Sequence, residues 1–281
     1  MVARFVAVRA LACAASALLA GPCGAQAADT DPFHWAYAAA FGAGVYRLGD
    51  GTEAQTYRGN FSVPLRQTRD ERAGVRLLLP VALGLQNLDA DALPVDRPDD
   101  EVEHVAFLPG IELEHRVGTR WTLRTRAQVG RAEELEGTQL SARLAAVGFR
   151  SRVKFENAPG SPALINGVLW TGFDPSDGVR RSLLRFTAGL ELDIPAARWR
   201  VRDSPMRWRP HVLRDWYYRP PAALAFGDEN FERRDAEWQL GVAAAREGGF
   251  KIWFIRFEAV GVAYRFSEHS DGLRFYLNSV F

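Results

Sequence analysis

The sequence predicts an all-β protein, an up-and-down antiparallel β-barrel of about twelve strands that crosses a membrane. Three observations carry this prediction. Apolar and polar residues alternate in many short segments, and the links between the segments alternate between long and short. Aromatic residues stand on the apolar face, many of them near segment ends. Together these features are typical of a barrel that turns its apolar face to lipid.

The alternation is clearest between Trp121 and Val129, where apolar or neutral odd positions alternate with polar even positions. A helix would spread these polar positions around its circumference, so the period of two indicates strands. Changes of phase near Ala146 and Ala259 predict two β-bulges. The predicted strands cover roughly residues 35–48, 55–66, 73–87, 102–117, 119–132, 138–154, 161–173, 181–194, 206–219, 231–245, 250–266 and 272–281.

The links between the predicted strands have their own periodicity. Polar and mostly acidic links follow every odd strand, at residues 49–53, 89–101, 133–137, 174–178, 220–230 and 267–272. The links after even strands are mostly shorter, such as 117–120, 157–162 and 248–249, with a longer basic exception at 198–205. Alternating long and short links indicate an up-and-down barrel with its long loops at one end.

Two soluble folds share this periodicity, a periplasmic β-sandwich and a lipocalin-like barrel. Both would bury the apolar face and expose the charged one. The aromatic residues favour the membrane barrel, because Trp and Tyr collect where a barrel meets the membrane interface. Examples on the apolar face are Trp35, Trp121, Trp208 and Trp253.

Composition removes other classes of protein. The 281 residues are 47% hydrophobic, which is too apolar for a disordered chain. With 35 Lys and Arg against 34 Asp and Glu, the chain lacks the basic field that supports nucleic-acid binding. After the N-terminal leader the sequence has no apolar run of about 18 residues, so no membrane-spanning helix is expected.

The N-terminus has the pattern of a secretory signal peptide. Arg4 and Arg9 form a positive region, residues 11–21 form a short apolar stretch, and Ala25 and Ala27 frame an A-x-A cleavage site. The apolar stretch is too short to act as a stop-transfer helix. We therefore expect cleavage after Ala27.

Cleavage at this point predicts three parts of the chain. Residues 1–27 are the signal peptide, residues 28–34 a short N-terminal segment, and residues 35–281 the barrel. Cys13 and Cys23 both lie in the leader. The secreted chain then has no disulfide, no thiolate metal site and no cysteine nucleophile, and no cofactor or metal is expected.

If the apolar faces meet lipid, the charged faces line the lumen. The hairpin that turns at Gly118 would then place Glu112 and Glu114 opposite or diagonal to Arg124 and Arg126. Basic residues outnumber acidic ones at the inward positions, so a conducting lumen would prefer anions. The predicted lumen-lining charges are Glu112, Glu114, Arg124, Arg126, Arg143, Arg150, Arg152, Arg185 and Glu191.

The last strand provides the sharpest single signal. Leu273, Phe275, Leu277 and Phe281 share one face, and the chain stops on Phe281. This strand resembles the C-terminal strand of Gram-negative outer-membrane proteins. The resemblance implies that Phe275, Leu277 and Phe281 form the signal that the barrel-assembly machinery reads.

With about twelve strands, the whole pattern resembles the translocator domain of autotransporters. Only residues 28–34 separate the predicted cleavage site from the first strand, which leaves no passenger, and no segment is a candidate for the linker helix. The chain is therefore most similar to solitary, passenger-free barrels of this type. The resemblance implies a monomer in the outer membrane of a Gram-negative bacterium, among lipids that include lipopolysaccharide.

The expected function is that of a pore, a structural element or an interaction scaffold of the cell envelope, and not that of an enzyme. The alternative is a barrel enzyme that hydrolyses lipid or peptide at its mouth. His269, in the acidic segment 267–271, has suitable residue types around it, but no second cluster supports a catalytic or metal site. A soluble periplasmic binding protein is the third alternative. Nucleic acid is not an expected partner.

Overall fold

The computed structural model describes residues 43–47, 53–68, 73–88, 104–134, 141–155, 160–176, 180–201, 204–218, 236–252, 255–267 and 271–277. Contacts divide the chain into residues 1–31 and 32–281, and all described strands belong to the second unit. The predicted leader and the segment 28–34 lie outside the described residues. Within the described residues, no helix is long and apolar enough to cross a membrane.

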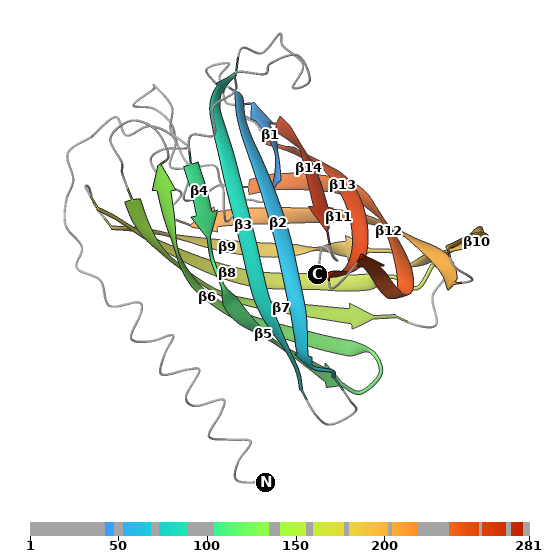
Figure 1. Cartoon of the computed structure of the whole chain (residues 1–281). Helices are drawn as coiled ribbons and strands as arrows, with labels where there is room; N and C mark the ends of the chain where they lie inside the picture. The colour runs from blue at the N-terminus through green and yellow to red at the C-terminus, as the bar shows by residue number, and fades with distance from the viewer. Residues whose placement is uncertain are drawn as a thin grey trace. The chain divides into compact units, whose positions relative to one another are not determined.

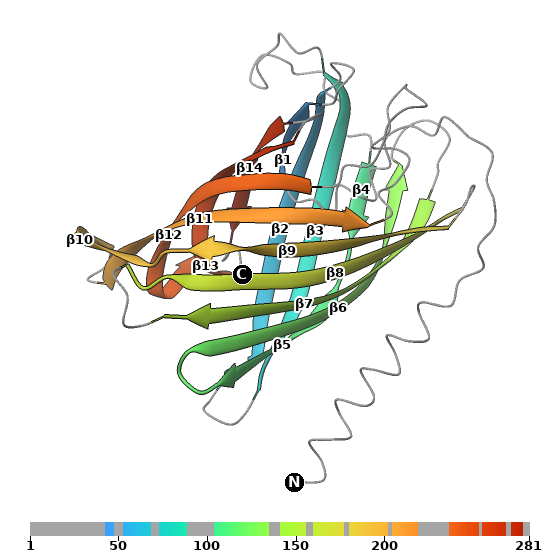
Figure 2. The same cartoon turned by 180° about the vertical axis from the view of Figure 1, so that it is seen from behind.

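The described strands form one antiparallel sheet (Figures 1 and 2). They are β1 (Ala43–Arg47), β2 (Glu53–Arg66), β3 (Gly74–Leu88), β4 (His104–Phe107), β5 (Gly110–Val117), β6 (Trp121–Glu134), β7 (Ser141–Lys154), β8 (Ala163–Pro175), β9 (Arg181–Glu191), β10 (Ile194–Val201), β11 (Ser204–Tyr218), β12 (Ala236–Ile252), β13 (Ile255–Phe266) and β14 (Asp271–Leu277).

The pairings close the sheet into a ring. β1 pairs with β14, with Ala43 opposite Phe275, and β9 pairs with β11, with Phe186 opposite Trp216. β4 and β5 share one place between β3 and β6, and β9 and β10 share one place beside β11. Counting each of these pairs once, the fourteen strands occupy twelve positions. The predicted up-and-down barrel of about twelve strands is therefore confirmed.

A proline divides the strand that β4 and β5 make together. Pro109 has no N–H to donate, so the ladder is interrupted between Phe107 and Gly110. The register continues across this break. Two residues separate Phe107 from Gly110, and two residues also separate their pairing partners on β3 and on β6. The backbone N–H of Leu108 donates to the carbonyl of Pro80, and that of Val129 donates to Pro109.

The links that follow β2, β5, β7 and β12 belong to one end of the barrel, which we call the turn end, and those that follow β1, β3, β6, β8, β11 and β13 belong to the other, the loop end. Gly118, with φ of 65°, makes the tight turn between β5 and β6. The basic link predicted at 198–205 is instead a hairpin: β10 continues to Val201 and pairs with β11. Among the described residues β10 pairs with β11 alone, and it projects at the edge of the sheet in Figures 1 and 2.

The two predicted bulges differ in outcome. β7 keeps an unbroken register with both neighbours through Ala146, so the predicted bulge there is wrong. Opposite Ala259 the register does shift, between Ala245 and Phe250 of β12. The extra residues thus belong to the partner strand, and they include Gly249 with φ of 73°. The link predicted at 248–249 is therefore part of β12.

Candidate functional site

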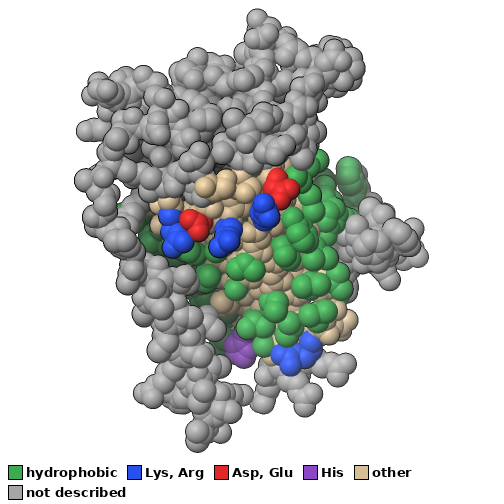
Figure 3. All heavy atoms as spheres, turned by 60° about the vertical axis from the view of Figure 1, so that its left-hand side comes forward, with side chains coloured by type: hydrophobic (Ala, Val, Ile, Leu, Met, Phe, Trp, Pro, Cys, Tyr) green, Lys and Arg blue, Asp and Glu red, His purple; other side chains and the backbone are tan. Residues whose placement is uncertain are grey.

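The two faces of the barrel wall have opposite chemistry. Large apolar side chains are exposed on the outer face, as at Val129, Phe149 and Leu190. Glu114, Gln239 and other polar side chains are buried on the inner face. Figure 3 shows one side of this apolar exterior, with charged side chains along its upper boundary. The interior is therefore where specific polar chemistry can occur.

The inner face carries a continuous row of paired positions. Residues that are directly opposite one another on paired strands point to the same side of the sheet. All members of the row therefore face the lumen. The row runs through seven strands, from β5 to β12, as Glu114, Arg124, Arg150, Gly167, Thr187, Asp215 and Glu237.

The first pairs of this row lie in the hairpin of β5 and β6. Glu112 is directly opposite Arg126, and Glu114 is directly opposite Arg124, so the register predicted from the sequence is confirmed. Arg124 Nε donates to Glu114 Oε2 over 3.0 Å. Glu114 is only 3% exposed, so this contact holds a buried charge-assisted pair at the turn end.

Strands that are not neighbours meet through Glu258 of β13. Arg124 Nη2 donates to both carboxylate oxygens of Glu258, each over 3.1 Å, and Arg76 of β3 also pairs with Glu258. Arg76 Nη2 donates to Glu114 Oε2 over 3.1 Å. We call Arg76, Glu112, Glu114, Arg124 and Glu258 the turn-side ion cluster. It connects β13 to strands on another part of the ring through the lumen.

Two further ion pairs lie near the turn end, one of which joins β7 to β9 across the intervening β8. Arg152 of β7 donates to Glu191 of β9 through Nη2 over 2.6 Å and through Nε over 3.1 Å. Arg207 Nε donates to Asp193 Oδ1 over 2.6 Å. Glu191 is 1% exposed, so removal of its partner would leave a buried carboxylate without its cation.

A second cluster lies near the loop end and consists of Arg185, Asp215, Tyr217, Glu237 and Arg265. Arg265 Nη2 pairs with Glu237, donates to Tyr217 Oη over 2.5 Å, and lies 3.4 Å from Asp215 Oδ2. Tyr217 Oη donates to Glu237 Oε2 over 2.8 Å. All five residues are less than 10% exposed, so this loop-side ion cluster is enclosed.

Neutral polar contacts fill part of the space between the two clusters. Gln239 Nε2 and His211 Nε2 lie 3.1 Å apart, and the rings of His211 and Tyr276 meet edge to face with centroids 5.8 Å apart. His211 is 6% exposed. Its partners are the Gln239 amide, the Tyr276 hydroxyl and the backbone carbonyl of Arg209, which together orient the ring.

Most predicted lumen charges lie on the inner face and are buried or half-buried. These are Glu112, Glu114, Arg124, Arg126, Arg150, Arg152, Arg185 and Glu191. Arg143 is the exception, since it is exposed. Because β7 has no bulge, Ala142, Leu144 and Ala146 hold the inner face and Arg143 points outward.

Of the other predicted site residues, some belong to the described residues and some lie outside them. Phe275 is 57% exposed on the outer face of β14, and Leu277 shares that face by alternation. Phe281, Ala25, Ala27 and His269 lie outside the described residues.

Asp215 and Tyr217 are buried on the inner face but are not among the site residues predicted from the sequence. Both share the parity of Arg207 and Arg209 on the same strand, so continuing the alternation through Leu213 would have found them. His211 shares that parity and was not assigned to the lumen either.

Metal chemistry finds no support among the described residues, which contain no group of three or more His, Cys, Asp or Glu able to hold a metal ion. The interaction that the described interior shows is ion pairing between arginines and carboxylates. The fold and interior together define a twelve-position antiparallel barrel with an apolar exterior and a charged lumen.

Comparison with solved structures identifies barrels of similar fold. The β-domain of the Bordetella autotransporter BrkA matches with a TM-score of 0.52 and 11% identity, over 83% of this chain and 95% of that one. The translocator domain of autotransporter NalP from Neisseria meningitidis matches with a TM-score of 0.48 and 13% identity, over 82% and 81%. No protein-family model and no curated protein matches the sequence. The fold of the chain is that of the autotransporter β-domain.

Proposed function

We propose that this chain is an outer-membrane β-barrel of a Gram-negative bacterium that works as a structural anchor or interaction scaffold, with its lumen held closed by charged side chains. The turn-side ion cluster carries the proposal. Glu258 of β13 pairs with Arg76 of β3 and Arg124 of β6, strands that are not its neighbours in the ring. Side chains that meet in this way occupy the lumen instead of leaving it open to solutes.

The dimensions and exterior of the wall support the membrane location. β6 has fourteen residues, which at about 3.3 Å per residue and a tilt of about 45° cover about 33 Å along the barrel axis. This matches the hydrocarbon thickness of a bilayer, about 30 Å. The exposed apolar side chains of the outer face would contact lipid, including lipopolysaccharide.

The proposed partners follow from this location. The barrel-assembly machinery would act on the last strand during biogenesis. The barrel would be a monomer, in keeping with the pairing of β1 with β14 of the same chain, which needs no strand from a second copy. The proposal assigns no reaction to the chain. The hydrolase alternative depends on the segment 267–271, most of which lies outside the described residues.

Cell fractionation with heat-modifiable gel mobility tests the location. We expect the chain in the detergent-resistant outer-membrane fraction, with faster mobility before boiling than after it. Recovery in the soluble periplasmic fraction without detergent would contradict the proposal and favour a soluble binding protein.

Planar-bilayer recording tests the closed lumen. The unmodified barrel should give no steady conductance, whereas Arg124→Ala combined with Glu258→Ala should conduct. Steady conductance of the unmodified barrel would favour the pore instead. In that case the basic interior predicts a preference for anions.

A further inference from the structure

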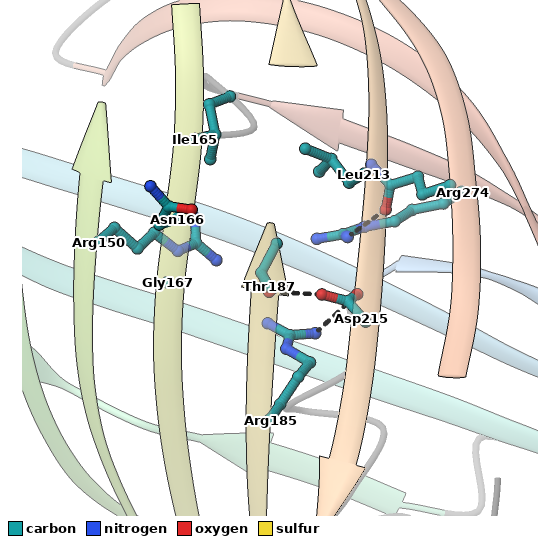
Figure 4. A pocket seen from close by; sticks show the side chains of 10 residues that line it. Arg150, Ile165, Asn166, Gly167, Arg185, Thr187, Leu213, Asp215 and Arg274 are labelled. Atoms are coloured by element: carbon teal, nitrogen blue, oxygen red, sulfur yellow. Dashed lines mark hydrogen bonds and ion pairs between the residues drawn. The ribbon is translucent and has the colours of Figure 1, made fainter. Parts of the chain in front are cut away.

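A cavity lies in the lumen beside the loop-side ion cluster, two of whose members, Arg185 and Asp215, line it. Its lining includes Arg150, Arg185, Thr187, Asp215 and Arg274, and it holds about 330 Å³ of empty space, counting the part open to solvent. Figure 4 shows Arg150, Arg185 and Arg274 extending into this space from three different strands. Ile165 and Leu213 form an apolar part of the wall.

A glycine in the inward row makes room for the cavity. Gly167 lies between Arg150 and Thr187 in the pairing of β7, β8 and β9. A Cβ atom at Gly167 would lie 3.3 Å from Arg150 Cγ and 3.8 Å from Thr187 Cβ. The missing side chain therefore leaves space beside the aliphatic part of Arg150, which a larger residue would fill.

The cavity has a surplus of positive charge. Three guanidiniums and one carboxylate, that of Asp215, give its lining a net charge of +2. In the turn-side ion cluster, by contrast, two arginines meet three glutamates. Arg150 is directly opposite Arg124 in the wall.

The acid of the cavity is already engaged by other groups. Thr187 Oγ1 donates to Asp215 Oδ1, and Arg265 lies 3.4 Å from Asp215 Oδ2. Arg185 Nη1 is 3.9 Å from the same Oδ2, which is beyond hydrogen-bond distance. Arg185 is 5% exposed, and its Nε has no hydrogen-bond partner in the structure. A buried guanidinium in this state has hydrogen-bonding capacity left for a ligand.

We propose that this cavity is a binding site for a small divalent oxyanion of the sulfate or phosphate type. Two negative charges match the surplus of the lining, and guanidiniums are the side chains best suited to bind tetrahedral oxyanions. Arg150, Arg185 and Arg274 bind the oxyanion, while Gln239 accepts a hydrogen bond from Arg274 over 3.0 Å and orients it. This inference goes beyond the proposed function and holds for the folded barrel in any location.

Binding of inorganic sulfate to the refolded full chain in detergent tests the proposal. Isothermal titration calorimetry at constant ionic strength should show one saturable site for sulfate and for phosphate at pH 8, and none for chloride. Arg150→Gln should weaken sulfate binding at least tenfold. Arg180→Gln is the matched control, because Arg180 is 76% exposed and pairs with Asp174 at the loop end, and it should change the affinity less than twofold.

A second variant tests whether sulfate binding needs the space in the cavity and not only its positive charge. Gly167→Val keeps every charge but fills the space beside Arg150, so it should abolish saturable binding while the heat-modifiable mobility of the folded barrel remains. If Arg150→Gln does not fold, Gly167→Val decides the question. Sulfate titration indistinguishable from chloride would overturn the proposal, and so would equal losses in Arg150→Gln and Arg180→Gln.

Discussion

Arg124 and Glu258 are 134 residues apart in the sequence, yet Arg124 Nη2 donates to both carboxylate oxygens of Glu258 at 3.1 Å. Their strands, β6 and β13, are not neighbours in the ring, so the contact passes through the lumen. The two side chains are 13% and 27% exposed, which reduces the solvent screening that weakens surface ion pairs.

Loss of this pair should destabilise the barrel. We expect Arg124→Gln and Glu258→Gln each to lower the free energy of unfolding by about 2 kcal/mol, because each removes one of the ion-pair partners of a partly buried charge. The double variant should lose less than the sum of the two, by about 1 kcal/mol. Urea unfolding in detergent, followed by gel mobility, measures these values. Strict additivity would show that the pair contributes no coupling.

A charge in the middle of the outer face should prevent insertion. Val168 lies near the centre of β8, is 38% exposed, and faces Phe149 and Phe186 on the neighbouring strands. Val168→Arg should cost about 2–4 kcal/mol near the bilayer midplane. Insertion into liposomes, assayed by protease protection, should fall sharply. Val168→Leu is the control, and normal insertion of Val168→Arg would mean that this face does not meet lipid.

The small side chains inside β13 leave room for an aromatic ring. Gly261 is directly opposite Tyr276, and a Cβ atom at Gly261 would overlap the Tyr276 ring. Gly261→Ala should therefore destabilise the barrel by about 1–3 kcal/mol through overpacking. Adding Tyr276→Leu should recover part of the loss in thermal unfolding. No recovery would indicate that the backbone, and not the ring, is displaced.

The end of the chain should control assembly. Deletion of Phe281 should reduce folded barrel in the outer membrane while secretion to the periplasm continues, because the resemblance to outer-membrane proteins places the assembly signal in this strand. Quantitative fractionation with unboiled gels measures the ratio of folded to unfolded chain. Phe281→Tyr keeps an aromatic end and should assemble normally. Unchanged folded levels after the deletion would refute the prediction.

Most of the strands, and the pairing within the hairpin of β5 and β6, could be predicted from the sequence. Alternation places Glu114 and Arg124 on one face, and the tight glycine turn between their strands allows only a few pairing registers. The same reasoning is wrong at Arg143, because the change in the polar pattern of β7 is not accompanied by a change in backbone phase. A charged side chain near the rim can point outward into water without any bulge.

Contacts across the lumen could not be predicted from the sequence. Periodicity assigns Glu258 to a face but does not say which of the other strands its side chain will reach, since that depends on the curvature of the ring. The cavity also depends on how the ring closes. Arg150, Arg185 and Arg274 lie on three strands, and only the closed sheet brings them together.

The edge of β10 that does not pair among the described residues affects the solubility of the folded barrel. Backbone groups at an unpaired edge can recruit a strand from another chain and so begin aggregation. Trp199, which is 61% exposed and packs edge to face on Trp208, would add to this tendency. However, Pro195 supplies no N–H, and the exposed charge of Arg200 opposes a second copy of the same strand. The chain thus carries its own protection against self-association at the one strand that leaves the described ring.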